Sequence, residues 1–192
     1  MKAMTQLDLI EAVRGHLDEQ EEFVCSQVRG LGREALNWKA APDGWSVAQC
    51  LDHLIRTADM YLGALDAAIS AAPPRAEEAH RNTWLGGKII AAVGPDSKAN
   101  VPVPKPLIPS EAPFDESICD RFLDQIGVIR ALVSRAESVD LNRAKLSSPM
   151  LKLIRFNLGD ALLILGVHGL RHIRQARRVI DAPEFPASKL PV

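Results

Sequence analysis

The sequence predicts an all-α protein, a four-helix bundle with a long proline-rich connection between its second and third long helices. In four long segments, apolar residues recur every three or four positions, which is the spacing of one helix face. Of the residues, 47% are apolar but only 5% aromatic, a balance that suits helices packed on helices better than a sheet. A length of 192 residues is enough for one domain. We therefore expect a single helical bundle domain over 1–192.

The first two long helices have recognisable ends. The first covers about 6–30 and stops at a pair of glycines, Gly30 and Gly32, which are poor in a helix interior. The second begins at Ser46, whose side chain can cap the first turn while Gln49 reaches back to it. Its helical spacing continues until the Pro-Pro pair at 73–74 prevents further helix.

The connection that follows is unusually long. A short helix is expected over 83–93, and the next stretch, 94–113, holds six of the thirteen prolines. Because irregular loops of this length are uncommon in compact domains, the segment should either cross the end of the domain or line a site.

The second half of the chain supplies the remaining two long helices. One is expected over about 115–137. The other begins near Asn157, with Asp160 three residues on as its capping partner, and ends before Pro183, which leaves a tail over 183–192. The pattern indicates no strands.

Charge and cysteine usage exclude several classes of function. The chain has 23 Lys and Arg against 24 Asp and Glu, a net charge of -1, so nothing in the bulk charge indicates nucleic acid or an anionic membrane as a partner. Its three cysteines show no C-x-x-C spacing, the first residues lack a signal-peptide core, and the most apolar stretch, 161–167, is too short to span a bilayer. We expect a cytoplasmic protein that acts through a local site.

Two histidines of the last helix interrupt its apolar stripe. His168 and His172 stand where the pattern requires core residues, and at i and i+4 both imidazoles can turn toward one point. Such a pair can offer two nitrogen ligands to a divalent metal, or it can make ordinary polar contacts in a core. Gly166 and Gly169 on either side of His168 leave either open space beside the imidazole or room for another helix.

A third histidine completes a resemblance. Trp45 and Ser46 open the second helix, Leu-Asp-His53-Leu follows, and His168-x-x-x-His172-x-x-Gln lies near the end of the chain. This pattern resembles the DinB-like (DinB/YfiT) superfamily of bacterial four-helix bundles. The resemblance implies that His53, His168 and His172 bind a divalent metal, typically zinc or nickel. Some relatives use a low-molecular-weight thiol together with the metal.

The resemblance also bears on the pocket. It places Trp45 near the pocket wall, whereas the pattern of the residues makes Trp45 a packing anchor at the start of its helix. Arg171 stands where relatives often carry another histidine. As a substrate-binding residue it could contact an anionic group at the pocket edge, and as one of several basic residues near a helix end it could simply meet the helix dipole.

Four other residues are weighed and set aside. His16 and His80 lie among polar neighbours and are expected in solvent. Cys50 is read as a small core residue rather than a ligand, and Asp52 as a solvent-facing residue rather than a partner of His53.

The sequence thus supports two readings of function. The first is a metal-dependent enzyme, a transferase or hydrolase, that acts on a small molecule through three histidines; no catalytic acid or base is assigned. The alternative is a metal-free helical bundle that serves as a dimerisation or small-ligand binding module. Leftover apolar faces are compatible with a homodimer.

Overall fold

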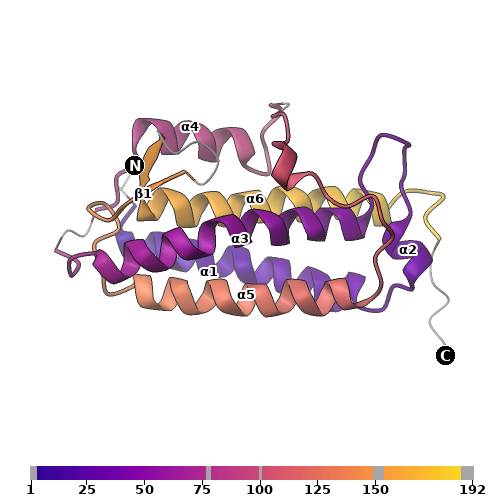
Figure 1. Ribbon diagram of the computed structural model, residues 1–192, viewed down its shortest axis with the longest axis horizontal. Helices are drawn as coiled ribbons and strands as arrows, with labels where there is room; N and C mark the ends of the chain where they lie inside the picture. Colours follow the sequence, from indigo (N-terminus) through magenta and orange to yellow (C-terminus); the bar gives the residue numbers. More distant parts are fainter. Residues whose placement is uncertain (1–3, 77–78, 100, 149–153, 187–192) are drawn as a thin grey trace.

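The computed structural model describes residues 4–76, 79–99, 101–148 and 154–186. This part of the chain is mostly helical, as expected (Figure 1). Its helices are α1 (Gln6–Phe23), α2 (Arg33–Asn37), α3 (Val47–Ala71), α4 (Trp84–Val93), α5 (Ser117–Ala136) and α6 (Leu158–Ile180), with a π-helical turn η1 (Val24–Val28) and a 3₁₀ turn η2 (Lys105–Leu107). In this part of the chain, no helix is both long and apolar enough to cross a membrane.

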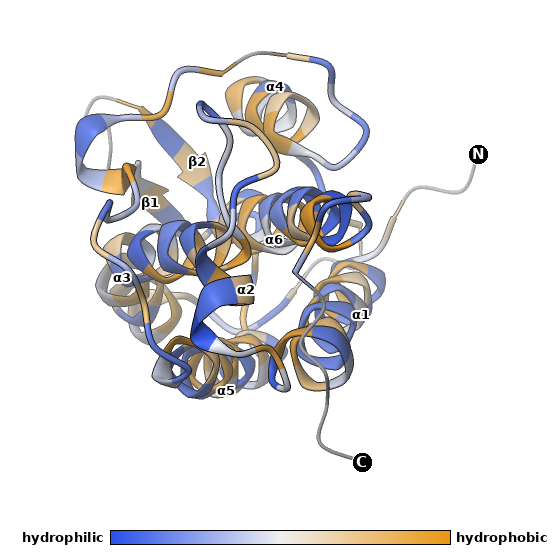
Figure 2. Cartoon of the chain, turned by 90° about the vertical axis from the view of Figure 1, so that its right-hand side faces the viewer, coloured by the Kyte–Doolittle hydropathy of each residue, from blue (hydrophilic) through white to orange (hydrophobic). Residues whose placement is uncertain are grey.

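The four long helices lie side by side and nearly parallel or antiparallel to one another. Helix α1 packs against α5 and α6, and α3 packs against the same two helices from the other side (Figure 1). The end-on view of Figure 2 shows these four helices grouped together, with α4 outside the group on the side of α6. Helix α6 therefore contacts α1, α3 and α4 at once.

Local hydrogen bonds set the starts of the long helices. The Ser46 hydroxyl accepts from the Gln49 backbone N–H at 3.1 Å, and the Gln49 side chain accepts from the Ser46 N–H at 3.2 Å. Asn157 and Asp160 make the same reciprocal pair at the start of α6. Each pair satisfies backbone donors that a helix start leaves without intrahelical partners. Both predicted helix starts are confirmed.

Two short strands are a correction to the sequence prediction. Strands β1 (Lys145–Ser147) and β2 (Arg155–Asn157) form an antiparallel pair, with Leu146 opposite Phe156. Both of these side chains are buried. Runs of three residues are too short to show the alternation that identifies a strand in a sequence. Of the expected tail over 183–192, residues 187–192 lie outside the described part of the chain.

The glycines of α6 allow α1 to approach closely. A Cβ added to Gly169 would overlap the side-chain amide of Gln20, and one added to Gly166 would lie 2.6 Å from Nδ1 of His16. Side chains of α1 therefore occupy the room that these glycines leave. Of the two explanations that the sequence offered, close approach of another helix is confirmed and open space beside the imidazole is wrong.

Candidate metal centre

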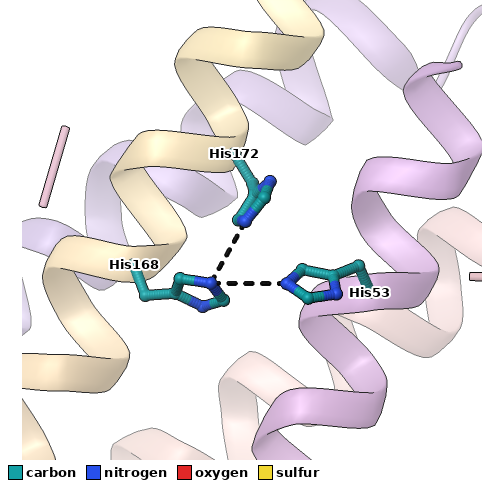
Figure 3. Close-up of side chains that lie close together, drawn as sticks. All are labelled: His53, His168 and His172. Atoms are coloured by element: carbon teal, nitrogen blue, oxygen red, sulfur yellow. Dashed lines mark hydrogen bonds between the residues drawn. The ribbon is translucent and has the colours of Figure 1, made fainter. Parts of the chain in front are cut away.

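Three histidines from two neighbouring helices converge in the structure. His53 comes from α3, and His168 and His172 come from successive turns of α6 (Figure 3). Nε2 of His168 lies 3.3 Å from Nε2 of His53 and 3.1 Å from Nε2 of His172. The structure thus brings together the three residues that were predicted as ligands.

The outer nitrogens of two of these rings have fixed partners. Nδ1 of His53 lies 2.7 Å from the Leu107 carbonyl oxygen, which can only accept a hydrogen bond. Nδ1 of His172 lies 2.9 Å from the Gln175 side-chain oxygen. Nδ1 of His53 therefore carries a proton, and so does Nδ1 of His172 with the Gln175 amide oriented so that its oxygen faces the ring. In the neutral rings both Nε2 atoms then present lone pairs toward His168. This is the orientation that second-sphere hydrogen bonds give to metal-ligating histidines.

Burial keeps the three imidazoles neutral. Burial, with smaller contributions from the charges of His53 and Arg171, lowers the pKa of His168 to about 3. Burial is also the main cause that lowers the pKa of His53 and holds the pKa of His172 well below its usual value. Because a metal binds the neutral form of histidine, these rings need lose no proton to act as ligands at neutral pH.

The spacing of the rings fits a divalent metal. Tetrahedral ligands at about 2.0–2.1 Å from a zinc ion lie roughly 3.3 Å from one another. The two Nε2–Nε2 distances of 3.3 and 3.1 Å are close to this value. Imidazole nitrogen is also a ligand for nickel, copper and iron, so the donor set fits several divalent metals.

The family comparison covers this whole site. A family model described as the DinB superfamily matches residues 16–176, from α1 to the end part of α6. The chain belongs to the DinB superfamily. No curated protein and no solved structure matches the chain. The three histidines all lie inside the region that the DinB superfamily model matches.

A cavity of about 490 Å³ opens beside the three histidines of this DinB superfamily member. Its walls come from α3, α4, α6 and the proline-rich connection, of which residues 101–104 and Leu107 contribute. Of the two roles predicted for that connection, lining a site is thus confirmed. The volume lies in the range of pockets that hold small organic ligands.

Trp45 forms part of the wall next to the histidines. Its ring stacks on His172 at 5.5 Å between centroids with 20° between planes, and lies 4.8 Å from the ring of His53. Trp45 also lines the cavity. It therefore holds two of the three imidazoles in place and faces the space where a ligand would bind.

Arg171 also lines the cavity, but its guanidinium is largely committed to the backbone. It donates to the carbonyl oxygens of Gly94, Ser97 and Ala99 at 3.3, 3.1 and 3.0 Å. These bonds fasten the start of the proline-rich connection to α6. Two of the five guanidinium N–H groups have no part in these bonds, and the role of Arg171 in substrate binding stays a prediction.

The far end of the same connection is fastened to α3. Asp52 accepts from the backbone N–H of Ser110 at 3.0 Å and from Arg56 at 2.7 Å, and the Gln49 side chain donates to the Ser110 carbonyl at 3.1 Å. Asp52 is only 3% exposed, so the expectation that it faces solvent is wrong. The segment that walls the cavity is thus held from both ends and, at Leu107, by His53 itself.

The remaining candidates take structural roles. Cys50 is buried, as expected for a core residue, and burial raises its pKa to about 12. His16 and His80 are half-buried and pack against Gly166 and Gly159, so the expectation of solvent exposure is wrong for both. Sequence reasoning gave no role to Gln175, although its position three residues after His172 places it on the same helix face.

Proposed function

We propose that the protein is a metal-dependent enzyme whose divalent metal, zinc or nickel, is held by Nε2 of His53, His168 and His172. The observation that supports this proposal most directly is that these three nitrogens lie close together. At the same time, Nδ1 of His53 bonds to the Leu107 carbonyl oxygen and Nδ1 of His172 to the Gln175 side-chain oxygen. The substrate is a small molecule bound in the adjoining cavity. The reaction is a transfer or a hydrolysis, and a transfer could use a low-molecular-weight thiol, as in some relatives.

A metal-free reading leaves the site unsatisfied. With Nδ1 protonated on His53 and His172, only His168 can supply an Nε2–H to the centre. That single proton can reach His53 or His172, but not both. Whichever of His53 and His172 does not receive the proton keeps a buried Nε2 lone pair with no hydrogen-bond donor. An unpaired buried acceptor of this kind costs on the order of 1–3 kcal/mol. A cation at the centre satisfies all three nitrogens at once.

The residues around the centre suit it to chemistry on a bound molecule. Three protein ligands leave one or more positions open, as catalytic rather than structural sites do. A divalent metal there supplies a nucleophile at neutral pH, because it lowers the pKa of a coordinated water or thiol. Trp45 and aliphatic side chains of α4 line the pocket, and the N–H groups of Arg171 that do not bond to the backbone are available to a polar substrate group at its edge.

The metal proposal is tested by metal analysis of protein purified without a histidine tag. We expect near one equivalent of metal, and its loss in the His168→Ala/His172→Ala double variant. A His16→Ala/His80→Ala double variant is the matched control and should keep the metal, since these histidines lie outside the cluster. Folded protein that holds no metal and takes up neither zinc nor nickel would overturn the proposal.

We also propose that α1, α3, α5 and α6 form the four-helix bundle of the family within a single domain. Their mutual packing in Figures 1 and 2 supports this arrangement. The homodimer stays a prediction that analytical ultracentrifugation can test.

A further inference from the structure

One face of α3 carries a second polar group into the cavity. His53, Thr57 and Tyr61 follow one another at intervals of four residues, and all three line the cavity. The Thr57 hydroxyl already donates to the backbone oxygen of His53 at 2.8 Å. The Tyr61 hydroxyl makes no hydrogen bond with any residue that the structure describes, although Tyr61 is only 6% exposed and its ring stacks on Phe156.

The Tyr61 hydroxyl is therefore available to a partner that enters the cavity, since Tyr61 lines its wall. Polar groups inside proteins are hydrogen-bonded in the large majority of cases, so this hydroxyl bonds either to water or to a ligand bound there. Burial also raises the pKa of Tyr61 to about 12, so the hydroxyl keeps its proton at any physiological pH. It is therefore a permanent hydrogen-bond donor at the cavity wall.

The rest of the cavity wall selects against charge on the body of a ligand. Aliphatic side chains and prolines form more than half of the lining residues, chiefly from α4 and from 101–107. Among the described lining residues, Arg171 is the only one with a formal charge at neutral pH, and three backbone carbonyls share its guanidinium. A charged group bound away from the three histidines would lose its hydration without gaining a counter-charge.

The distance along α3 sets the dimensions of the ligand. Tyr61 follows His53 by eight residues, and at 1.5 Å per residue the two Cα atoms are about 12 Å apart along the helix axis. One molecule of ordinary substrate size can therefore lie with one end at the three histidines and another part at Tyr61. The cavity volume of about 490 Å³ accommodates such a molecule.

We propose that Tyr61 is a substrate-binding residue that donates a hydrogen bond to an acceptor oxygen, such as a carbonyl, on a substrate with an uncharged and mainly apolar body. This assignment rests on the proposed function, because it treats the cavity beside the three histidines as the substrate site. It adds to that function a class of substrate and a residue that recognises it.

The test compares acetophenone with α-methylstyrene, in which a methylene group replaces the carbonyl oxygen of the same framework. Dissociation constants of both compounds are measured by ligand-observed NMR for the wild-type protein and for Tyr61→Phe, with metal as isolated. For each protein, the dissociation constant of acetophenone is divided by that of α-methylstyrene. Comparing this ratio between the two proteins removes differences in the general hydrophobicity of the compounds. We expect Tyr61→Phe to shift this ratio about fivefold against acetophenone, the value of one ordinary hydrogen bond.

Thr57→Val is the matched control, because it removes a hydroxyl from the same cavity face that is already bonded to His53. It should shift the ratio less than twofold. A ratio that does not change in Tyr61→Phe, an equal shift in Thr57→Val, or a wild-type cavity that binds neither compound would each overturn the assignment. Metal content is measured on the same preparations. Absence of metal would contradict the proposed metal site, whereas an unchanged ratio of dissociation constants would contradict the Tyr61 assignment, so the two failures can be distinguished.

Discussion

The buried imidazole of His168 predicts a specific loss of stability in acid. Its pKa is about 3 in the folded protein, mainly because of burial, against an ordinary value of 6.5. In the unfolded chain the ring takes up a proton as the pH falls through 6.5, while in the folded protein it does so only near 3. The unfolded state binds the extra proton over this interval, so the free energy of unfolding falls as the pH is lowered from 6.5 toward 3.

The size of the effect follows from that interval. At pH 5 the ring is about 1.5 pH units below its unfolded pKa, and each unit is worth about 1.36 kcal/mol, which gives about 2 kcal/mol from His168 alone. The assay is urea unfolding of metal-free protein at pH 7.5 and pH 5, for the wild type and for His168→Gln. The loss of stability between the two pH values should be about 2 kcal/mol smaller in His168→Gln.

Added metal sharpens the same experiment. Zinc should raise the stability of the wild type at pH 7.5 and still do so at pH 5, because burial keeps His168 neutral in the folded protein while protons compete with zinc for the histidines of the unfolded chain. His168→Gln should gain less from zinc at pH 7.5. If the wild type and His168→Gln lose the same stability between pH 7.5 and 5, the burial argument for His168 is wrong.

Four further substitutions test other parts of the structure. Gly169→Ala should lower the free energy of unfolding by about 1–3 kcal/mol, because the new methyl group overlaps a buried side chain of α1. Gly127→Ala on α5 should raise it by about 0.5–1 kcal/mol, because a Cβ there has nothing within 4 Å. Urea unfolding measures both. Asp160→Ala should cost about 2–4 kcal/mol in the same assay, since it removes the carboxylate that accepts from the Asn157 N–H at the start of α6 and from the Thr83 hydroxyl before α4; unchanged stability would contradict this. Gln175→Ala should weaken metal binding about tenfold or more in competition with a chelator, because His172 loses its hydrogen-bond acceptor.

Local features of the sequence account for what could be predicted. A capping pair such as Ser46 and Gln49 involves residues three apart, and its outcome depends on little beyond the first helical turn. The pairing of His168 with His172 is equally local, because residues four apart on a helix must lie on one face. The prediction that His53 joins these two histidines depended on resemblance to a family, because His53 lies more than a hundred residues before them in the sequence.

The contacts that make the site selective come from distant parts of the chain. Leu107 carries no recognisable signal, because its contribution to His53 is a backbone oxygen that any residue would supply. Asp52 is buried because Ser110 approaches it across 58 residues, a distance over which periodicity carries no information. The burial of Tyr61 against the cavity likewise depends on where α4 and the proline-rich connection lie.

The sequence by itself therefore determined the helical class, the starts of α3 and α6, and the pair of imidazoles on one face of α6. Periodicity and capping decide these features, because they are set by interactions within a few residues. Only the tertiary structure decided that Nε2 of His53, His168 and His172 meet, that α1 fills the room beside the glycines of α6, and that the proline-rich connection walls a cavity. Those outcomes depend on packing between segments whose order in the chain does not fix their distance in space.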